Sequence, residues 1–357
     1  MSIASPLPSA ASYGEEDLAR FHENLGRAHM RGQWQNETVR KSGGGGGVRD
    51  NGSFAPKSGG EGHLWPWQAV RGFLAESCDA VPESFTARRS IMFNNPGLAR
   101  GTTNTINMGI QMIRPGELAW AHRHSISAIR FVIDGGSGVS TVVDGVNCPM
   151  ETGDLILTPQ WMWHDHHNAT AKAAIWLDVL DGPVLGMFNQ IVFESYGEKR
   201  QTMRNVAPEG NERVLRYPWR DAEAALLATP IEALSRQDGI TLDYRDPRTG
   251  EAPLPTLGCR LHRLPAGFTG ERHRRGISAV YHVVRGEGRT TVGDRTLDWK
   301  QGDSFVVPNW SWRRHDNRSA SDDAILFSVH DTPLLQNLGL YREDLALRVG
   351  AAESSDK

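Results

Sequence analysis

The 357-residue chain lacks several features that whole classes of protein require. Its 39 Lys and Arg residues are offset by 42 Asp and Glu, so the formal charge of −3 leaves no basic excess to bind nucleic acid or an anionic bilayer. No run of about 18 apolar residues could form a membrane-spanning helix, and residues 1–12 lack the cationic and apolar stretches of a secretory signal. We therefore expect a cytoplasmic protein that binds neither nucleic acid nor membranes.

Cysteine is also scarce. Cys78, Cys148 and Cys259 are odd in number and far apart, with no C-x-x-C pair, which argues against a disulfide framework and a thiolate zinc site. Any bound metal must therefore have His, Asp or Glu ligands. What the chain does have is 39% hydrophobic residues and the length of about two domains, on the guide of roughly 100–200 residues each.

The N-terminal part predicts two helices separated by a linker. Apolar residues recur at helical spacing behind the acidic Glu15, but residues 41–62 contain nine glycines among small polar residues and predict a flexible linker. We take residues 1–62 as this helix and linker. A second helix is expected from His63 to just before Pro82.

Beyond Arg88 the chain predicts an all-β fold. Short β-branched segments alternate with turn dipeptides such as Pro115-Gly116 and Asp144-Gly145, and strands of this length and spacing are typical of a sandwich or barrel. The predicted strands are Ser90–Phe93, Thr105–Ile113, Ala128–Ile133, Ser140–Val143 and Asp154–Leu157.

A second block of the sequence repeats the first. Residues 122–133 align without gaps on residues 273–284, and residues 153–163 align on residues 302–312. The offsets of 151 and 149 residues indicate two copies of one β-domain rather than an array of small repeats. The predicted parts are then a first copy with its preceding helix at 63–182, a mainly helical connector at 183–254, the second copy at 255–345 and a tail at 346–357.

The first copy carries a pattern that suits a metal. His122 and His124 lie two residues apart, so a strand would direct both imidazoles to one face. His164 follows Pro159 in the second motif and is expected on a neighbouring strand. Together the three histidines would present neutral nitrogen ligands to one metal and leave its opposite positions open for substrate and an oxidant or water.

These glycine, histidine and proline positions match the two signature motifs of the cupin superfamily. The chain most closely resembles the gentisate 1,2-dioxygenase family, which includes salicylate and 1-hydroxy-2-naphthoate dioxygenases. The resemblance runs from about His63 to Asp344 and implies an all-β bicupin, with two double-stranded β-helix (jelly-roll) barrels, a helical connector and a helical N-terminal segment. It rests on Arg88-Arg89 through Asn95-Pro96-Gly97, Pro115-Gly116-Glu117, His122-Arg-His-Ser, Arg130-Phe, Gly153-Asp154 through Trp161-x-Trp163-His164-Asp165-His166, Tyr217-Pro218 and Pro255-Thr-Leu-Gly258.

The resemblance implies one Fe(II) per chain, bound in the N-terminal cupin by His122, His124 and His164. Arg130 stands where cupins commonly place a glutamate ligand, as in the gentisate-type enzymes, and can pair with the carboxylate of an aromatic acid. Substrate and O2 would meet at the iron, and the ring would open between its carboxyl- and hydroxyl-bearing carbons with both oxygen atoms incorporated.

Further roles are also carried over from the family. His166 is expected to act as an acid or base or to contact oxygen, and Asp165 to orient a ligand imidazole by accepting its N–H. Of the arginine pair we favour Arg89, because it opens a predicted strand. The family also suggests a homotetramer. The full set of expected substrate-binding residues is Arg89, Arg88, Arg130, Gln111, Asn107, Gly109 and Trp120.

The second copy keeps only one of the three ligands. Arg275 and Arg313 replace the other two, which leaves His273 alone. We therefore expect one metal site per chain, and a structural role for His315, the counterpart of the acid-base candidate.

Gentisate is the expected substrate, with salicylate, 5-substituted salicylates and 1-hydroxy-2-naphthoate as the alternatives. Ile106 and Asn107 stand where gentisate enzymes tend to have aromatic or small apolar residues, and Trp120 where they have a smaller residue or proline. Outside the class, the alternatives are a zinc cupin isomerase and a non-catalytic ligand-binding bicupin. Arg130, in place of a carboxylate ligand, argues against the first, and the intact histidine triad argues against the second.

Overall fold

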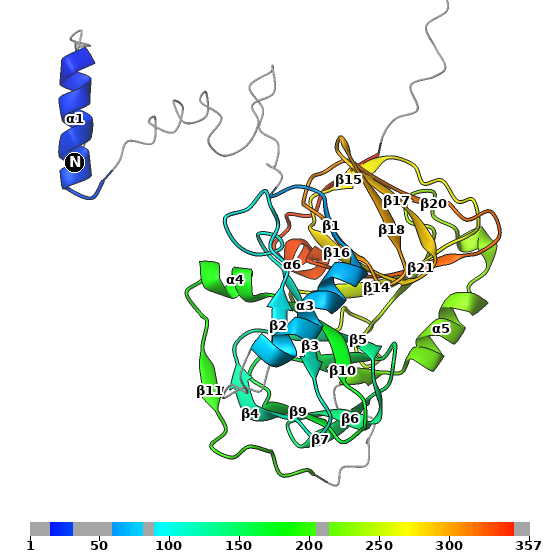
Figure 1. Cartoon of the computed structure of the whole chain (residues 1–357). Helices are drawn as coiled ribbons and strands as arrows, with labels where there is room; N and C mark the ends of the chain where they lie inside the picture. The colour runs from blue at the N-terminus through cyan, green and yellow to red at the C-terminus, as the bar shows by residue number, and fades with distance from the viewer. Residues whose placement is uncertain (1–14, 31–58, 81–88, 205–213, 346–357) are drawn as a thin grey trace, which may run out of the picture. The chain divides into compact units, whose positions relative to one another are not determined.

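The computed structural model describes residues 15–30, 59–80, 89–204 and 214–345 (Figure 1). It divides into two units, residues 1–57 and residues 58–357. The first contributes helix α1 (Glu15–Arg27), which confirms the predicted N-terminal helix. Most of the predicted linker, Arg88 and the predicted tail lie outside the described residues.

The second unit contains two jelly-roll barrels, as predicted (Figure 1). In the first, a six-stranded sheet in the order β12-β8-β5-β10-β3-β2 faces a five-stranded sheet in the order β11-β4-β9-β6-β7. Val132 and Trp176 of the first sheet share a core with Val139 and Val143 of the second. The strands are β2 Arg89–Met92, β3 Asn107–Ile113, β4 Leu118–His124, β5 Ala128–Asp134, β6 Gly136–Val143, β7 Val146–Met150, β8 Leu155–Thr158, β9 His164–Asn168, β10 Ala174–Leu180, β11 Phe193–Ser195 and β12 Arg216–Tyr217.

The second barrel repeats this plan. Its sheets have the orders β1-β19-β16-β21-β14-β13 and β18-β17-β20-β15-β22, and Tyr281 and Phe305 of the first sheet share a core with Leu297 and Trp299 of the second. The strands are β1 His63–Trp65, β13 Ile240–Asp243, β14 Gly258–Leu264, β15 His273–Arg275, β16 Ala279–Arg285, β17 Glu287–Val292, β18 Arg295–Lys300, β19 Ser304–Val307, β20 Arg313–Asn317, β21 Ala324–His330 and β22 Glu343–Leu345.

The two six-stranded sheets pack back to back. Alternate residues of β5 and β10 turn away from their own barrel and join a core with residues of β16, β19 and β21. At its centre the rings of Phe131 and Phe327 stack with centroids 4.4 Å apart. One large apolar core therefore lies between the barrels, while a separate core fills each barrel.

Each barrel completes its sheet with a strand from outside its own repeat. β1 precedes the first barrel but pairs with β19 of the second, and β12 lies between the barrels but pairs with β8 of the first. Each of these strands is followed by Pro-Trp and a helix, at Pro66-Trp67 and Pro218-Trp219. The repeat is therefore longer than the aligned motifs suggested, and its first strand is exchanged between the barrels, while the helices α3 and α5 contact β2 and β13.

This exchange corrects the predicted boundaries. The segment at 183–254 is not a mainly helical connector, because β11, β12 and β13 within it join barrel sheets. Within this segment, α5 (Trp219–Ala228) is followed, after Pro230, by a short 3-10 turn, η1 (Ile231–Ala233). The remaining helices are α3 (Trp67–Ala80), which confirms the second predicted helix, α4 (Gly182–Met187) and α6 (Thr332–Asn337).

Two expected absences can be compared with the structure. Cys78, Cys148 and Cys259 carry free thiols. Within the described ranges, the structure contains no helix with the length and apolarity needed to cross a membrane.

Candidate metal centre

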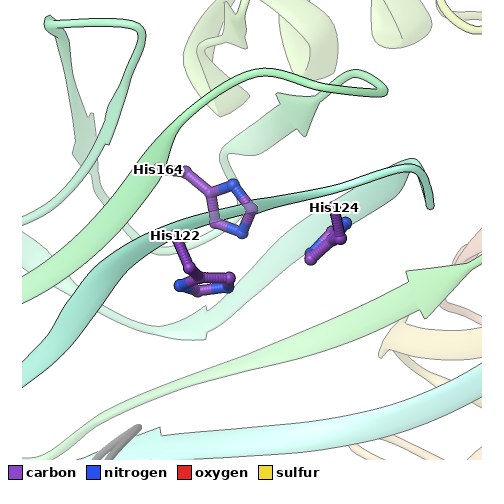
Figure 2. Close-up of side chains that lie close together, drawn as sticks. All are labelled: His122, His124 and His164. Carbon is purple, nitrogen blue, oxygen red and sulfur yellow. The ribbon is translucent and has the colours of Figure 1, made fainter. Parts of the chain in front are cut away.

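Three histidines converge inside the first barrel (Figure 2). His122 and His124 lie on β4 and, being two residues apart, direct their side chains to the same face. β9 runs antiparallel beside β4 and places His164 opposite His122. One ring nitrogen from each residue lies within 4.8 Å of the others. The structure thus brings the three predicted ligands together.

Backbone carbonyls fix the orientation of all three rings. Nδ1 of His122 lies 2.7 Å from the carbonyl oxygen of Trp120, Nδ1 of His124 lies 2.7 Å from that of Ile126, and Nδ1 of His164 lies 3.0 Å from that of Met162. Because a carbonyl only accepts hydrogen bonds, each Nδ1 carries the proton. Each Nε2 therefore keeps the lone pair that a metal ion requires.

This arrangement corrects the role predicted for Asp165. Its carboxylate accepts hydrogen bonds from the backbone and side-chain N–H groups of Gln201, both at 3.1 Å, and not from a ligand imidazole. On β9 it also alternates with His164, so the two side chains leave opposite faces of the strand. Asp165 fixes the segment after β11, and the carbonyls orient the ligands.

The donor set fits a metal ion of the kind that imidazoles bind. All three histidines are buried, and Nε2 of His164 has no hydrogen-bond partner although it is inaccessible to water. Burial, together with the neighbouring His122 and the charge of Arg130, holds the pKa of His164 well below its usual value. A buried neutral imidazole with an unused lone pair is costly unless something occupies that position, and a cation does so.

Arg130 faces this cluster from the opposite sheet. It lies on β5, is fully buried, and donates through Nη1 to the hydroxyl of Thr158. Its Nε lies 3.4 Å from the carboxylate of Asp178 on β10, where strand register also makes the two residues neighbours. Burial lowers the pKa of Arg130, while the charge of Asp178 opposes that shift. A guanidinium normally stays charged even so, which provides a buried cation for an acidic ligand.

His166 also points into the barrel, two residues beyond His164 on β9. Its Nδ1 lies 2.7 Å from the hydroxyl of Thr141, and its ring lies 5.2 Å from that of Trp176. Its ring centroid lies 5.9 Å from that of His164, and whether His166 transfers a proton stays a prediction.

Most of the remaining predicted pocket residues lie on β2 and β3 of the six-stranded sheet, and Trp120 lies on β4 of the other sheet. Gln111 and Gly109 lie opposite Trp176 and Asp178 in strand register, so they line the barrel interior. Asn107 is two residues away on the same face of β3. Gly109 also has a packing reason, since a Cβ there would come within 2.6 Å of Met92 Sδ.

Arg89 is placed elsewhere. Register puts it beside Met112, on the other face of the sheet, and its guanidinium forms a buried salt bridge with Glu117. Trp120 is covered by the ammonium of Lys199, 4.9 Å from the ring centroid. The structure therefore gives Arg89 a structural partner in place of the predicted substrate contact.

Sequence reasoning missed Thr158, Asp178, Trp176 and Thr141, the side chains that hold or surround Arg130 and His166. One of them had a visible signal. Asp178 is the lone acidic residue in the apolar run of β10, and a buried acid in such a strand requires a partner.

Fold and site together define a bicupin with a three-histidine centre in its first barrel. Residues 109–180 and 260–330 each match the family model described as a cupin domain. The chain is 36% identical to a 1-hydroxy-2-naphthoate 1,2-dioxygenase of Nocardioides sp. (strain KP7), over 92% of this chain and 87% of the relative. It is 37% identical to a 5-aminosalicylate 1,2-dioxygenase of Comamonas sp, over 92% of this chain and 90% of the relative.

A solved structure of a related enzyme has a similar fold. The salicylate 1,2-dioxygenase of Pseudoaminobacter salicylatoxidans, solved as adducts with gentisate, matches with a TM-score of 0.79 at 27% identity, covering 95% of this chain and 96% of that one. The chain belongs to the family of gentisate, salicylate and 1-hydroxy-2-naphthoate 1,2-dioxygenases.

Proposed function

We propose that this chain is an iron(II)-dependent dioxygenase that opens an ortho-hydroxy aromatic carboxylate between its carboxyl- and hydroxyl-bearing carbons, with both atoms of O2 incorporated. One observation carries the proposal: three imidazoles fixed by backbone carbonyls face a buried arginine across the first barrel. His122, His124 and His164 would hold one Fe(II) per chain. Iron, when bound, supplies the redox chemistry that activates O2 for reaction with the ring.

Charge favours an acidic, chelating substrate. Three neutral ligands leave a divalent ion with its full charge, and Arg130 adds a second buried cation nearby. An aromatic acid with a neighbouring hydroxyl offers two oxygens to the metal, while its carboxylate can also reach the planar fork of Arg130.

Unused polar atoms support a ligand in this interior. Nε2 of Gln111 and Nε1 of Trp176 are buried without hydrogen-bond partners, on the face of the sheet that carries Arg130. Native interiors rarely leave donors unpaired. Carboxylate and hydroxyl oxygens of a substrate are acceptors of the kind that these donors lack.

Several similar aromatic acids are candidate substrates for this chain. Relatives named for 1-hydroxy-2-naphthoate, 5-aminosalicylate and gentisate are 36%, 37% and 36% identical to this chain, so identity does not rank them. Gentisate is our first choice, with salicylate, 5-substituted salicylates and 1-hydroxy-2-naphthoate as the alternatives. The cytoplasmic location expected from the sequence stays a prediction.

Oxygen consumption tests the proposal. The chain is loaded with Fe(II) under anaerobic conditions and assayed against each of these acids, with His124→Ala as the control. Uptake with at least one acid, lost in His124→Ala, is the expected result. One bound iron per chain without uptake for any acid would overturn the dioxygenase, and metal analysis showing zinc would favour an isomerase.

We also propose that the chain self-associates, as a tetramer by family resemblance. The segment from α4 to β11 leaves large apolar side chains in solvent: Met187, Phe188, Ile191 and Phe193 are 50–64% exposed. Neighbouring apolar groups of this size commonly mark a protein interface. The Phe193 ring stacks on that of His122 at 5.0 Å, so this surface borders the metal centre. Light scattering on Phe188→Ser/Ile191→Ser should show smaller assemblies than the parent, and an unchanged mass would contradict this interface.

A further inference from the structure

The second barrel has a partly open cavity of about 170 Å³, which is lined by residues of its strands and by Thr332 and Gln336 of α6. The lining is mostly polar and includes Arg260, His262, Arg275, Arg313, Ser328 and His330. An interior of this kind, in a barrel without the metal ligands, requires an explanation because buried polar groups are retained only when something pairs with them.

Arg313 is the least compensated of the charged groups. Arg313 is 2% exposed, its Nε donates to Nε2 of His273 at 3.1 Å, and its Nη2 is buried without a hydrogen-bond partner. Among the described residues no carboxylate forms a salt bridge with it. Arg275, by contrast, pairs with Asp238 and Glu343 at 2.7 Å each. Arg313 therefore brings a positive charge and an unused donor to the cavity.

His330 supplies a second set of unused polar atoms. It lines the same cavity, and both of its ring nitrogens are buried without hydrogen-bond partners. Burial, and then the charge of Arg260, lower its pKa to about 3, so the ring is neutral near pH 7. A neutral imidazole offers one N–H donor and one acceptor.

Arg313 occupies the position in the second barrel that corresponds to a metal-ligand position in the first. Arg313 aligns with His164, so the second barrel carries a fixed cation in the region where the first barrel gathers its metal ligands. An acid that approaches a metal ion in one barrel meets a guanidinium in the other. We propose that the second barrel binds one small carboxylate anion, paired with Arg313 and hydrogen-bonded by His330.

Size and access agree with a small ligand. The cavity is below the roughly 300–1,000 Å³ of pockets for drug-sized molecules, which suits an open-chain acid of a few carbons. Arg260, His330, Thr332 and Gln336 also line a neighbouring cleft of about 660 Å³. The cleft provides an entrance from the side of α6. The site does not depend on the metal centre.

Calorimetric titration with maleate tests the proposal. We expect one maleate per chain in the full-length protein, and the same site in His122→Gln, which removes a ligand of the first barrel only. Arg313→Gln should weaken this binding about 10–100-fold, the usual cost of losing a hydrogen bond to a charged group. Dimethyl maleate, which has no charge, should not bind.

Two further variants protect the test against misfolding. Arg313→Lys keeps the charge without the planar fork. Its affinity for maleate should lie between those of the parent and Arg313→Gln. Gln336→Trp replaces an exposed side chain at the cleft and should weaken maleate binding without disturbing the barrel. No binding to the parent chain, equal binding by folded Arg313→Gln, or binding of sulfate in place of maleate would overturn the proposal.

Discussion

The two barrels share one strand arrangement, but different side chains fill their interiors. In the first, Nδ1 of His166 meets Thr141 at 2.7 Å, and in the second Nδ1 of His315 meets Thr290 at 2.8 Å. The frame therefore keeps its buried His–Thr pair whether or not ligands surround it. This repetition favours a structural role for His166, since the described residues around its counterpart include no cluster of three metal-ligating side chains.

The difference lies in what fills the centre. Where the first barrel turns three imidazoles toward one point, the second places Arg313 against the remaining His273 and pairs Arg275 with Asp238. A guanidinium that donates to His273 Nε2 uses the lone pair that a metal would need. The comparison shows that this fold holds its interior together with either a metal-ligand set or an internal ion-pair network.

The largest expected difference between the barrels follows from substituting the aligned histidines His122 and His273. His122→Gln should abolish iron binding and reduce ring-opening activity by more than about 100-fold, because a lost ligand costs at least as much as the 10–100-fold of a lost supporting contact. His273→Gln should keep both, since Gln can still accept from Arg313. Elemental analysis with oxygen uptake gives the answer, and equal iron loss in both variants would contradict a single site in the first barrel.

Substitution of Arg130 tests whether this residue binds the aromatic acid in the first barrel. Arg130→Lys keeps the charge but loses the planar fork, so we expect KM for the aromatic acid to rise about 10-fold or more while iron content stays constant. Arg289→Lys on β17, whose partner Asp298 lies on the surface, is the matched control. Steady-state kinetics decide, and an unchanged KM would remove Arg130 from substrate binding.

Acid should destabilise the second barrel through its buried histidines. Burial lowers the pKa of His262, His273 and His282 to about 4, whereas an unfolded histidine titrates near 6.5. The unfolded chain thus binds protons first, so this stability is complete above pH 6.5 and is lost as the pH falls towards 4. For His282 alone the loss is up to about 3 kcal/mol.

Thermal unfolding measured from pH 7.5 to pH 4 checks this sign. The midpoint temperature should fall as the pH is lowered, and the midpoint of His282→Gln should fall less steeply than that of the parent. A midpoint that rises on acidification, or an identical slope for the variant, would contradict the assignment.

Local signals in the sequence predicted much of the fold and the ligand set. The two-residue spacing of His122 and His124 was enough to place both on one face of β4, because strand geometry has a fixed period. The exchange of β1 and β12 was not predicted, since pairing with the other barrel is a long-range choice. Its sequence signal, the shared Pro-Trp at Pro66 and Pro218, preceded the aligned motifs and was missed.

Residue roles were harder to predict than residue positions. The family resemblance implied that Asp165 orients a ligand imidazole, yet Asp165 and His164 are neighbours along β9 and face opposite ways. Arg89 was assigned to substrate from its place in a motif, but register puts it on the outer face with Glu117. Both roles came from the position of a residue in a motif, whereas the partners of a side chain depend on the face of the strand from which it projects.

The smallest expected effect concerns the helices that follow the exchanged strands β1 and β12. The backbone N–H of Trp219 donates to Asp154 at 2.9 Å, and that of Trp67 donates to Asp303 at 2.8 Å, so each carboxylate anchors the start of a helix. Asp154 also forms a salt bridge with Arg216 at 2.8 Å. Asp303→Ala should therefore cost about 1–2 kcal/mol of unfolding free energy and Asp154→Ala about 1 kcal/mol more.

Denaturant unfolding measures both costs. Glu287→Ala, which removes an exposed carboxylate from β17, is the control and should change the unfolding free energy by less than about 0.5 kcal/mol. Equal losses for the two aspartates would mean that the Arg216 salt bridge adds nothing. A loss in only one variant would mean that this anchor of a helix start stabilises one barrel alone, because the same kind of backbone hydrogen bond is removed from each.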